Sequence, residues 1–313
     1  MMRTLAKYKQ PLKILFALFL LLYIFKLVNI PSLMITLKEA NIGLLLLAFV
    51  LMIINQLLIS NVKWSLILNS YGISLPFKKL CSLYLLGMFF SIFLPGAYSG
   101  DVVRAYKVSR STENPLKGAM SVVIERFTGL IGLLIVCLIA LLFIKQAVLN
   151  LQVKLFAISF IFSVFIFFLL LFSRNLVKKM SFLLNFFSEG IESKLKEIYE
   201  SMYLMRDRKI QFGTAVLLSI VFQFLVVVIN YIIVMSLGIE VPLSFFFLII
   251  PVISLISMLP ITLNGIGVRD LSYIGLLGAV GVAKEPAFAV GLIAFSMVML
   301  LSLSGGIIYI REK

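Results

Sequence analysis

The chain contains 313 residues, of which 62% are hydrophobic and 13% are charged, and its mean hydropathy is +1.15. Apolar runs of about twenty residues recur along it, and each can cross the roughly 30 Å hydrocarbon core of a bilayer. These values exclude a soluble globular protein and predict an all-α polytopic membrane protein. The sequence holds no histidine, so we expect no catalytic residue, no metal site and no cofactor.

The formal net charge of +15 is explained by cytoplasmic loops beside anionic lipid headgroups, so no nucleic-acid partner is expected. Cys81 and Cys137 lie inside apolar segments, which indicates neither a disulfide framework nor a metal-binding motif. The first apolar run follows four basic residues and lacks a small-residue cleavage site. We therefore interpret it as a retained span rather than a signal peptide.

In chain order, the apolar runs cover about 12–30, 42–60, 78–94, 118–144, 153–172, 210–237, 243–259, 270–281 and 286–310. The segment 173–209 carries eight Lys and Arg residues, so the positive-inside rule places it in the cytoplasm together with the basic N-terminus. We expect a multi-pass protein of the cell membrane with both termini cytoplasmic.

The positive charges of the loops also predict how the short apolar runs lie in the membrane. A full crossing by 78–94 would place Arg104, Lys107, Arg110 and Lys117 outside, against the same rule. We therefore predict that 78–94 begins a re-entrant hairpin from the cytoplasm, and that 243–281 forms one from outside. The expected fold has about six full spans and two re-entrant hairpins. Eight or nine conventional spans are the alternative, because a run of 17 residues nearly suffices to cross.

Two polar interruptions, LPGAYSGDVVRAY at 94–106 and LPITLNGIGVRDLSY at 259–273, match each other. At an offset of 165 residues they share Leu94/Leu259, Pro95/Pro260, Gly100/Gly265, Val103/Val268 and Arg104/Arg269. Apolar segments broken by Gly and Pro at corresponding positions of two halves are typical of transporters with inverted repeats. We predict one transmembrane domain over 1–313, with repeats at about 42–145 and 207–310 and an amphipathic cytoplasmic linker helix at 175–206. Ordinary loops between membrane helices are the alternative.

Each interruption is expected to start a half-helix. Gly100 follows Ser99, and Gly265 follows Asn264, so each pair offers a capping side chain and a sharp turn. The partly positive N-terminus of each half-helix could then hold an anion such as a phosphate.

Charged residues follow both glycines. Arg104 and Arg269 lie one turn further along, and a guanidinium fork suits phosphate or carboxylate. Snorkelling to the cytoplasmic interface is the alternative for Arg104. Charges in a bilayer usually pair and face a cavity, so a purely structural ion-pair network is the alternative for the acidic residues. The candidate substrate-binding residues are Arg104, Arg269, Gly100, Asp101, Gly265, Asn264, Asp270, Glu125 and Arg126. The predicted interface anchors, which flank boundaries of apolar runs, are Trp64, Tyr71, Tyr84, Tyr98 and Tyr106.

At these residues the chain resembles the flippase-like family, also called the lysylphosphatidylglycerol synthase transmembrane region. The resemblance covers about 10–310 and rests on Gly100-Asp101 with Arg104, Glu125-Arg126, and Leu259-Pro260 through Gly265, Gly267, Arg269 and an acidic residue. Ser99 stands where the family commonly has glycine, and Asp270 where it commonly has glutamate. The resemblance implies an integral membrane protein that handles lipids, including aminoacylated phospholipids or lipid-linked glycans. Full-length synthases add a soluble catalytic domain, which we expect this chain to lack because it stops at Lys313.

Two hypotheses follow for function. The first is a protein that translocates or binds an anionic phospholipid or lipid-linked glycan, with the half-helix ends and arginines holding the headgroup. The second is a non-transporting membrane scaffold that presents lipid to a separate partner enzyme. The absence of histidine disfavours a third possibility, a membrane-embedded transferase, so we do not expect an enzyme.

Overall fold

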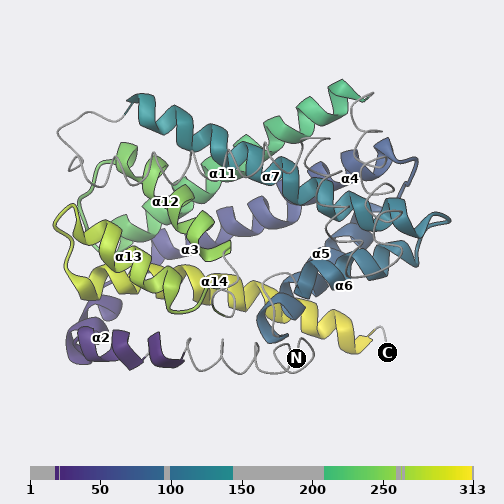
Figure 1. The fold of residues 1–313 in the computed structure, drawn as a ribbon. Helices are drawn as coiled ribbons and strands as arrows, with labels where there is room; N and C mark the ends of the chain where they lie inside the picture. The colour runs from purple at the N-terminus through teal and green to yellow at the C-terminus, as the bar shows by residue number, and fades with distance from the viewer. Residues whose placement is uncertain are drawn as a thin grey trace, which may run out of the picture.

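A computed structural model of the protein describes residues 18–20, 22–94, 99–143, 208–258, 262 and 265–311. These residues form helices and connections without a β-strand (Figure 1), so the predicted all-α class is confirmed for the part of the chain that they cover. The labelled helices are α2 (Ile30–Lys38), α3 (Ile42–Ile53), α4 (Ser60–Ser70), α5 (Phe77–Phe93), α6 (Ser99–Ser109), α7 (Pro115–Phe143), α11 (Lys209–Ser236), α12 (Leu243–Met258), α13 (Val268–Gly278) and α14 (Lys284–Arg311). The π-helix η1 (Ile54–Ile59) joins α3 to α4.

Four stretches of the described chain are helical, long and apolar enough to cross a membrane. They are Ile42–Ser70, Pro115–Ala140, Lys209–Ser236 and Lys284–Arg311, and they correspond to the expected runs 42–60, 118–144, 210–237 and 286–310. The bent pair Leu18–Leu27 and Ile30–Lys38 turns by 83° and makes a fifth span if it is counted as one. Six spans stay a prediction, because 153–172 lies outside the described residues, as does the expected linker helix 175–206.

Short polar residues set several helix ends. Asn29 Oδ1 accepts the Ser32 N–H at 3.1 Å and Asn41 Oδ1 accepts the Leu44 N–H at 3.1 Å, which satisfies donors that the first turns of α2 and α3 leave free. After α11, Gly238 has a φ of 68°. Only glycine adopts this left-handed conformation without strain, so the chain can leave the helix there.

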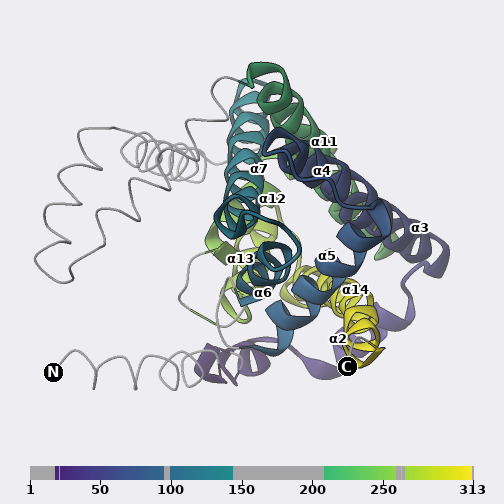
Figure 2. The same cartoon turned by 90° about the vertical axis from the view of Figure 1, so that its right-hand side faces the viewer.

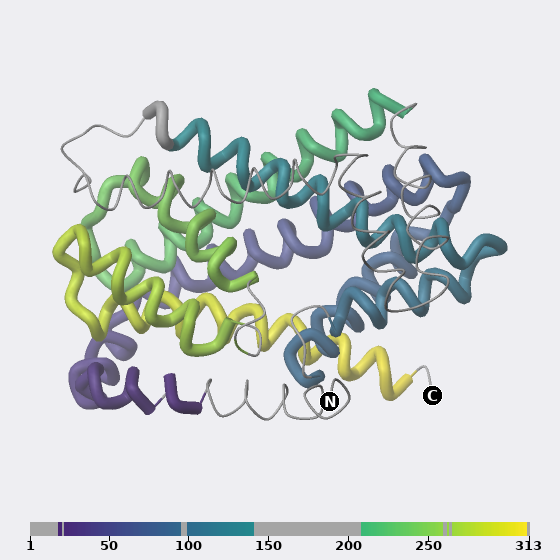
Figure 3. The backbone as a smooth tube through the Cα atoms, viewed as in Figure 1, coloured from purple at the N-terminus to yellow at the C-terminus, as the bar shows by residue number. Residues whose placement is uncertain are grey.

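The long helices pack through small residues. Figures 2 and 3 show the course of these helices. Gly132 of α7 faces α11 so closely that an added Cβ would lie 2.7 Å from the Cβ of Ser219. Gly305 of α14 faces the backbone carbonyl of Leu85 in α5. Small residues permit this approach of backbones in membrane bundles, where van der Waals packing drives association. Large apolar side chains such as Ile42 and Ile210 remain exposed on the outside, as a lipid-facing surface requires.

Each polar interruption separates two helices that pack against one another. The helices α5 and α6 meet where a Cβ on Gly100 would overlap the Gly87 carbonyl oxygen. The helices α12 and α13 likewise pack together, and α12 is buried along most of its length. A short helix that is apolar all round belongs in a protein interior. The re-entrant path of each helix pair, the side from which it enters the membrane, and the inverted relation of the two halves stay predictions.

Candidate functional site

A cavity of about 410 Å³ lies where the helix pairs α5–α6 and α12–α13 approach the long helices. Its charged lining residues are Asp101 and Arg104 from α6, Arg126 from α7 and Arg269 from α13. The structure therefore brings both repeated arginines to one cavity, although they are 165 residues apart in sequence. Uncharged apolar and polar side chains from α5, η1, α11, α12, α13 and α14 complete the wall.

Arg104 is held from several sides and is only 2% exposed. Its Nη2 donates to Glu125 Oε2 at 2.6 Å, and its guanidinium lies 4.2 Å from the ring centre of Trp64 and 4.4 Å from that of Tyr84. A cation between two aromatic faces gains cation–π attraction on both sides. Gly87 makes room for its aliphatic stem, since a Cβ there would lie 2.5 Å from Arg104 Cδ.

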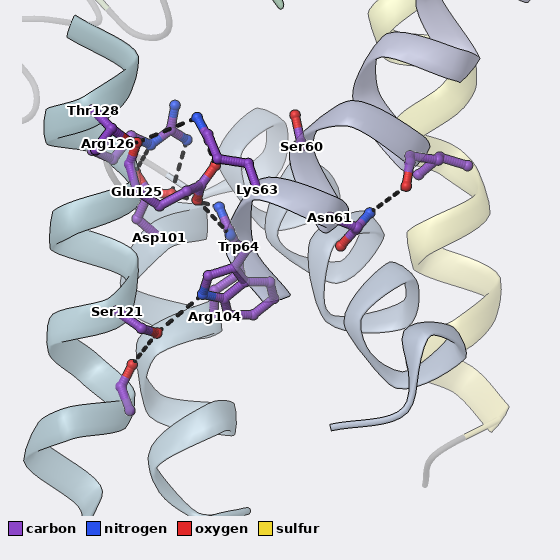
Figure 4. Close-up of polar contacts among 12 residues, drawn as sticks. Ser60, Asn61, Lys63, Trp64, Asp101, Arg104, Ser121, Glu125, Arg126 and Thr128 are labelled. Carbon is purple, nitrogen blue, oxygen red and sulfur yellow. Dashed lines mark hydrogen bonds and ion pairs between the residues drawn. The ribbon is translucent and has the colours of Figure 1, made fainter. Parts of the chain in front are cut away.

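These contacts correct two expectations. Arg104 does not snorkel to an interface, because Glu125 and the two rings hold it in the interior. Trp64 is fully buried and Tyr84 is 7% exposed, so neither residue is an interface anchor. The Trp64 indole N–H instead donates to Ser121 Oγ at 3.0 Å (Figure 4), which fixes the plane of the ring beside Arg104.

Glu125 of α7 joins two buried cations. Besides Arg104, it faces Lys63 of α4, with 3.5 Å between Lys63 Nζ and Glu125 Oε1. Lys63 Nζ also donates to the backbone carbonyl of Glu125 at 3.3 Å, and Figure 4 shows the three side chains converging from α4, α6 and α7. Sequence reasoning missed Lys63. A lysine inside an otherwise uncharged helical stretch was the signal that could have found it.

Asp101 and Arg126 form the second ion pair. Arg126 Nε and Nη2 reach the two Asp101 carboxylate oxygens at 2.7 Å and 2.8 Å, which is the planar two-bond geometry of a guanidinium fork. The Arg126 side chain is 48% exposed, against 14% for Asp101. Arg104 adds a long contact of 3.5 Å to Asp101. Asp101 lies in the first turn of α6, where the helix dipole favours a negative charge.

Arg269 and Asp270 form a third pair, contributed by α13. Arg269 Nη2 lies 2.8 Å from Asp270 Oδ1, and its guanidinium stacks 4.7 Å from the ring centre of Phe295. Asp270 Oδ2 accepts the Gly267 N–H at 3.0 Å, so the carboxylate also secures the start of the helix. Ion pairs that involve the predicted charged residues are therefore present in both halves of the chain.

Two further predicted site residues are placed differently. Gly100 does not line the cavity and serves close packing of α6 on α5. Gly265 has a φ of 72° and lies near Ser257 of α12, so it makes the turn that precedes α13. Asn264 lies outside the described residues. Among the residues that the structure describes, no group of three or more His, Cys, Asp or Glu side chains is arranged to hold a metal ion.

Comparison with known proteins agrees with this architecture. Residues 10–305 match the family described as the lysylphosphatidylglycerol synthase TM region. The chain belongs to this family. It is also 23% identical, over 301 residues, to the UPF0104 membrane protein PH1989 of Pyrococcus horikoshii, an alignment that covers 88% of this chain and 89% of that protein. No solved structure matches the chain.

Membership of the family makes the chain a multi-pass membrane protein, and it accounts for the apolar helices seen in the structure. The matched region includes every charged residue of the cavity, from Asp101 to Arg269. The cavity therefore belongs to the region that defines the family, and its chemistry is the starting point for function.

Proposed function

We propose that this protein binds the anionic headgroup of a phospholipid or lipid-linked glycan in the cavity and moves it across the membrane. The observation that carries the proposal is the convergence of Arg104, Arg126 and Arg269 from both halves of the chain on one cavity. Guanidinium groups are well suited to phosphate. Their concentration within an apolar bundle calls for an anionic partner.

The size of the cavity limits what it holds. A volume of about 410 Å³ lies at the small end of the usual range for ligand pockets, roughly 300–1,000 Å³. It suits a headgroup with its phosphate and excludes long acyl chains. In the proposed complex, the acyl chains stay in the surrounding lipid while the headgroup passes along the charged wall.

The test is lipid scrambling in liposomes with a fluorescent anionic phospholipid. Arg269→Ala should slow scrambling by about tenfold, the effect of losing one charge-assisted contact. Arg269→Lys should restore only part of the rate, because the charge returns without the fork. Arg110→Ala is the matched control, since Arg110 is an exposed arginine directly after the end of α6. Equal rates for the wild type and Arg269→Ala would contradict the proposal.

The alternative is a non-transporting module that presents lipid to a separate enzyme. It is favoured by the name of the matched family, which describes the transmembrane region of a synthase. In this case the cavity would bind the headgroup without releasing it on the other side. Purified protein that retains anionic lipid but scrambles none in liposomes would favour this second function.

A further inference from the structure

The helix that precedes α2, Leu18–Leu27, forms an N-terminal arm beside the bundle (purple in Figure 1). It turns into α2 at a bend of 83°. The corner is tied to α14, because the Asn29 N–H donates to Glu285 Oε1 at 3.1 Å. Within the arm, Leu20 is 9% exposed and Ile24 is fully buried. One face of the arm therefore packs on the protein.

This buried face covers one side of α13. A Cβ on Gly267, directly before α13, would lie 2.7 Å from the Cβ of Leu20. Ile24 belongs to the same apolar cluster as Leu271 and Ile274 of α13. The arm therefore meets both the start of α13 and its first two turns.

The side of α13 that the arm covers is opposite to the cavity. Arg269 and Tyr273 line the cavity. At about 100° per residue, Leu271 and Ile274 lie about 200° and 140° around the helix from Arg269. Among the described residues, none from the arm lines the cavity. The arm can therefore act on the cavity only through α13.

The ion-pair partner of Arg269 belongs to its own helix. Asp270 is the next residue, and its carboxylate also accepts the Gly267 N–H at 3.0 Å. Besides the ring stacking on α14 described above, Arg269 therefore takes its position from the start of α13. Arg104 differs, because Glu125 holds it from another helix, α7.

We infer that the N-terminal arm is a brace for the cavity wall, with Leu20 as a positioning residue for Arg269. By packing on Gly267, Leu20 fixes where α13 begins, and Asp270 and Arg269 take their places from there. Opening the 2.7 Å approach to an ordinary contact of 3.4–4 Å would move the start of α13 by about 1 Å, because close-packed interiors transmit strain. The role in lipid transport rests on the proposed function, which requires Arg269 at the cavity.

The contact is tested by a double-mutant cycle on the thermal unfolding of purified full-length protein. Gly267→Ala should lower the Tm by about 2–6 °C more than Gly281→Ala. The control is matched, because Gly281 has a φ of 87° against 82° for Gly267 and has no atom within 4 Å of an added Cβ. Adding Leu20→Gly should abolish the difference, whereas Leu22→Gly on the exposed face of the arm should not. Equal Tm values for the two alanine variants, or a difference that persists with Leu20→Gly, would overturn the contact.

The position of α13 can be measured without lipid transport. Spin labels at Gly275→Cys and Glu113→Cys, in protein without its two native cysteines, report the distance from α13 to the turn between α6 and α7. Both positions are exposed. Gly267→Leu, a larger wedge, should shift the mean distance by about 2 Å, and Gly281→Leu should leave it unchanged. An unchanged distance with Gly267→Leu would mean that the arm yields instead of α13, which overturns the brace.

The link to Arg269 is tested by scrambling rates in liposomes. Gly267→Ala should slow scrambling by up to about tenfold, the loss expected for Arg269→Ala. In the Arg269→Ala protein it should add less than about a twofold loss, because both changes act through one side chain. An unchanged rate for Gly267→Ala, or a second full loss in the Arg269→Ala protein, would overturn the inference. If Arg269→Ala itself scrambles at the wild-type rate, the proposed function fails, and the spin-label distance still decides whether the arm positions α13.

Discussion

At the scale of single residues, Glu125 is the partner on which the buried charges depend. It contacts Arg104 at 2.6 Å and Lys63 at 3.5 Å, and all three side chains are at most 6% exposed. A buried ion pair is weak evidence for stability as a whole, because desolvation offsets much of the attraction. Removing one member is nevertheless costly, since it leaves the other charges in the interior without compensation.

We therefore expect Glu125→Gln to lower the free energy of unfolding by about 3–5 kcal/mol, because two cations would lose their shared carboxylate. The measurement is denaturant unfolding of the purified protein in mixed micelles. Glu113→Gln provides the control, and a change at an exposed position should stay within about 0.5 kcal/mol. Equal stability of the two variants would show that the Glu125 contacts add nothing to the fold.

At the scale of helices, the contact of α5 with α6 brings Arg104 to the cavity. The pairing depends on Gly100, where a Cβ would overlap the Gly87 carbonyl oxygen and the Ser91 hydroxyl oxygen. The carbonyl belongs to a helix backbone and cannot turn aside as a side chain can. A larger residue must therefore separate the two helices and carry Arg104 away from Glu125.

Gly100→Ala should destabilise the protein by about 1–3 kcal/mol through overpacking and should reduce lipid scrambling. Gly275→Ala is a matched control in α13, since Gly275 is exposed and no atom lies within 4 Å of an added Cβ. This control should be neutral, or stabilising by up to about 1 kcal/mol, because alanine favours helix. Thermal unfolding and scrambling assays on both variants test the comparison. A Gly100→Ala protein that matches the control would contradict the close contact.

The helix scale also shows how far the sequence could predict the site. The glycines and prolines of the interruptions, and the acidic residues beside Arg104 and Arg269, predicted two breaks and a charged network. A lone lysine in an apolar stretch marked Lys63 as a candidate, but the helix face on which Lys63 and Trp64 lie was not predictable, because η1 precedes them. A π-turn adds one residue and rotates all later side chains by roughly 100° relative to a regular helix. Side-chain periodicity read from the sequence therefore assigns them to the wrong face.

At the scale of the whole molecule, membrane topology is the principal remaining prediction. The charge rule expects the turn after α6 in the cytoplasm and the α11–α12 connection outside. The structure provides one position in each place, the partly exposed Lys107 near the end of α6 and the exposed Glu240 between α11 and α12. Only two native cysteines, Cys81 and Cys137, would need replacement before labelling.

In intact cells that express the cysteine-free protein, Glu240→Cys should react with an impermeant thiol reagent and Lys107→Cys should not. Permeabilised cells should label at both positions, which checks that each thiol is reachable. Labelling of Lys107→Cys from outside would mean that α5 crosses the membrane completely, and the first re-entrant hairpin would then be wrong.

The stacking of Arg104 on Trp64 gives the protein an intrinsic optical probe. Trp64 is the one tryptophan in the sequence, so the indole emission of the whole protein originates next to the cavity. A charge within 4.2 Å of the ring acts on the excited state directly. Occupancy of the cavity is thereby linked to the tryptophan fluorescence, a signal that requires no label, no mutation and no knowledge of the ligand. Fractions of the purified protein that carry different native lipids can be compared by this emission alone.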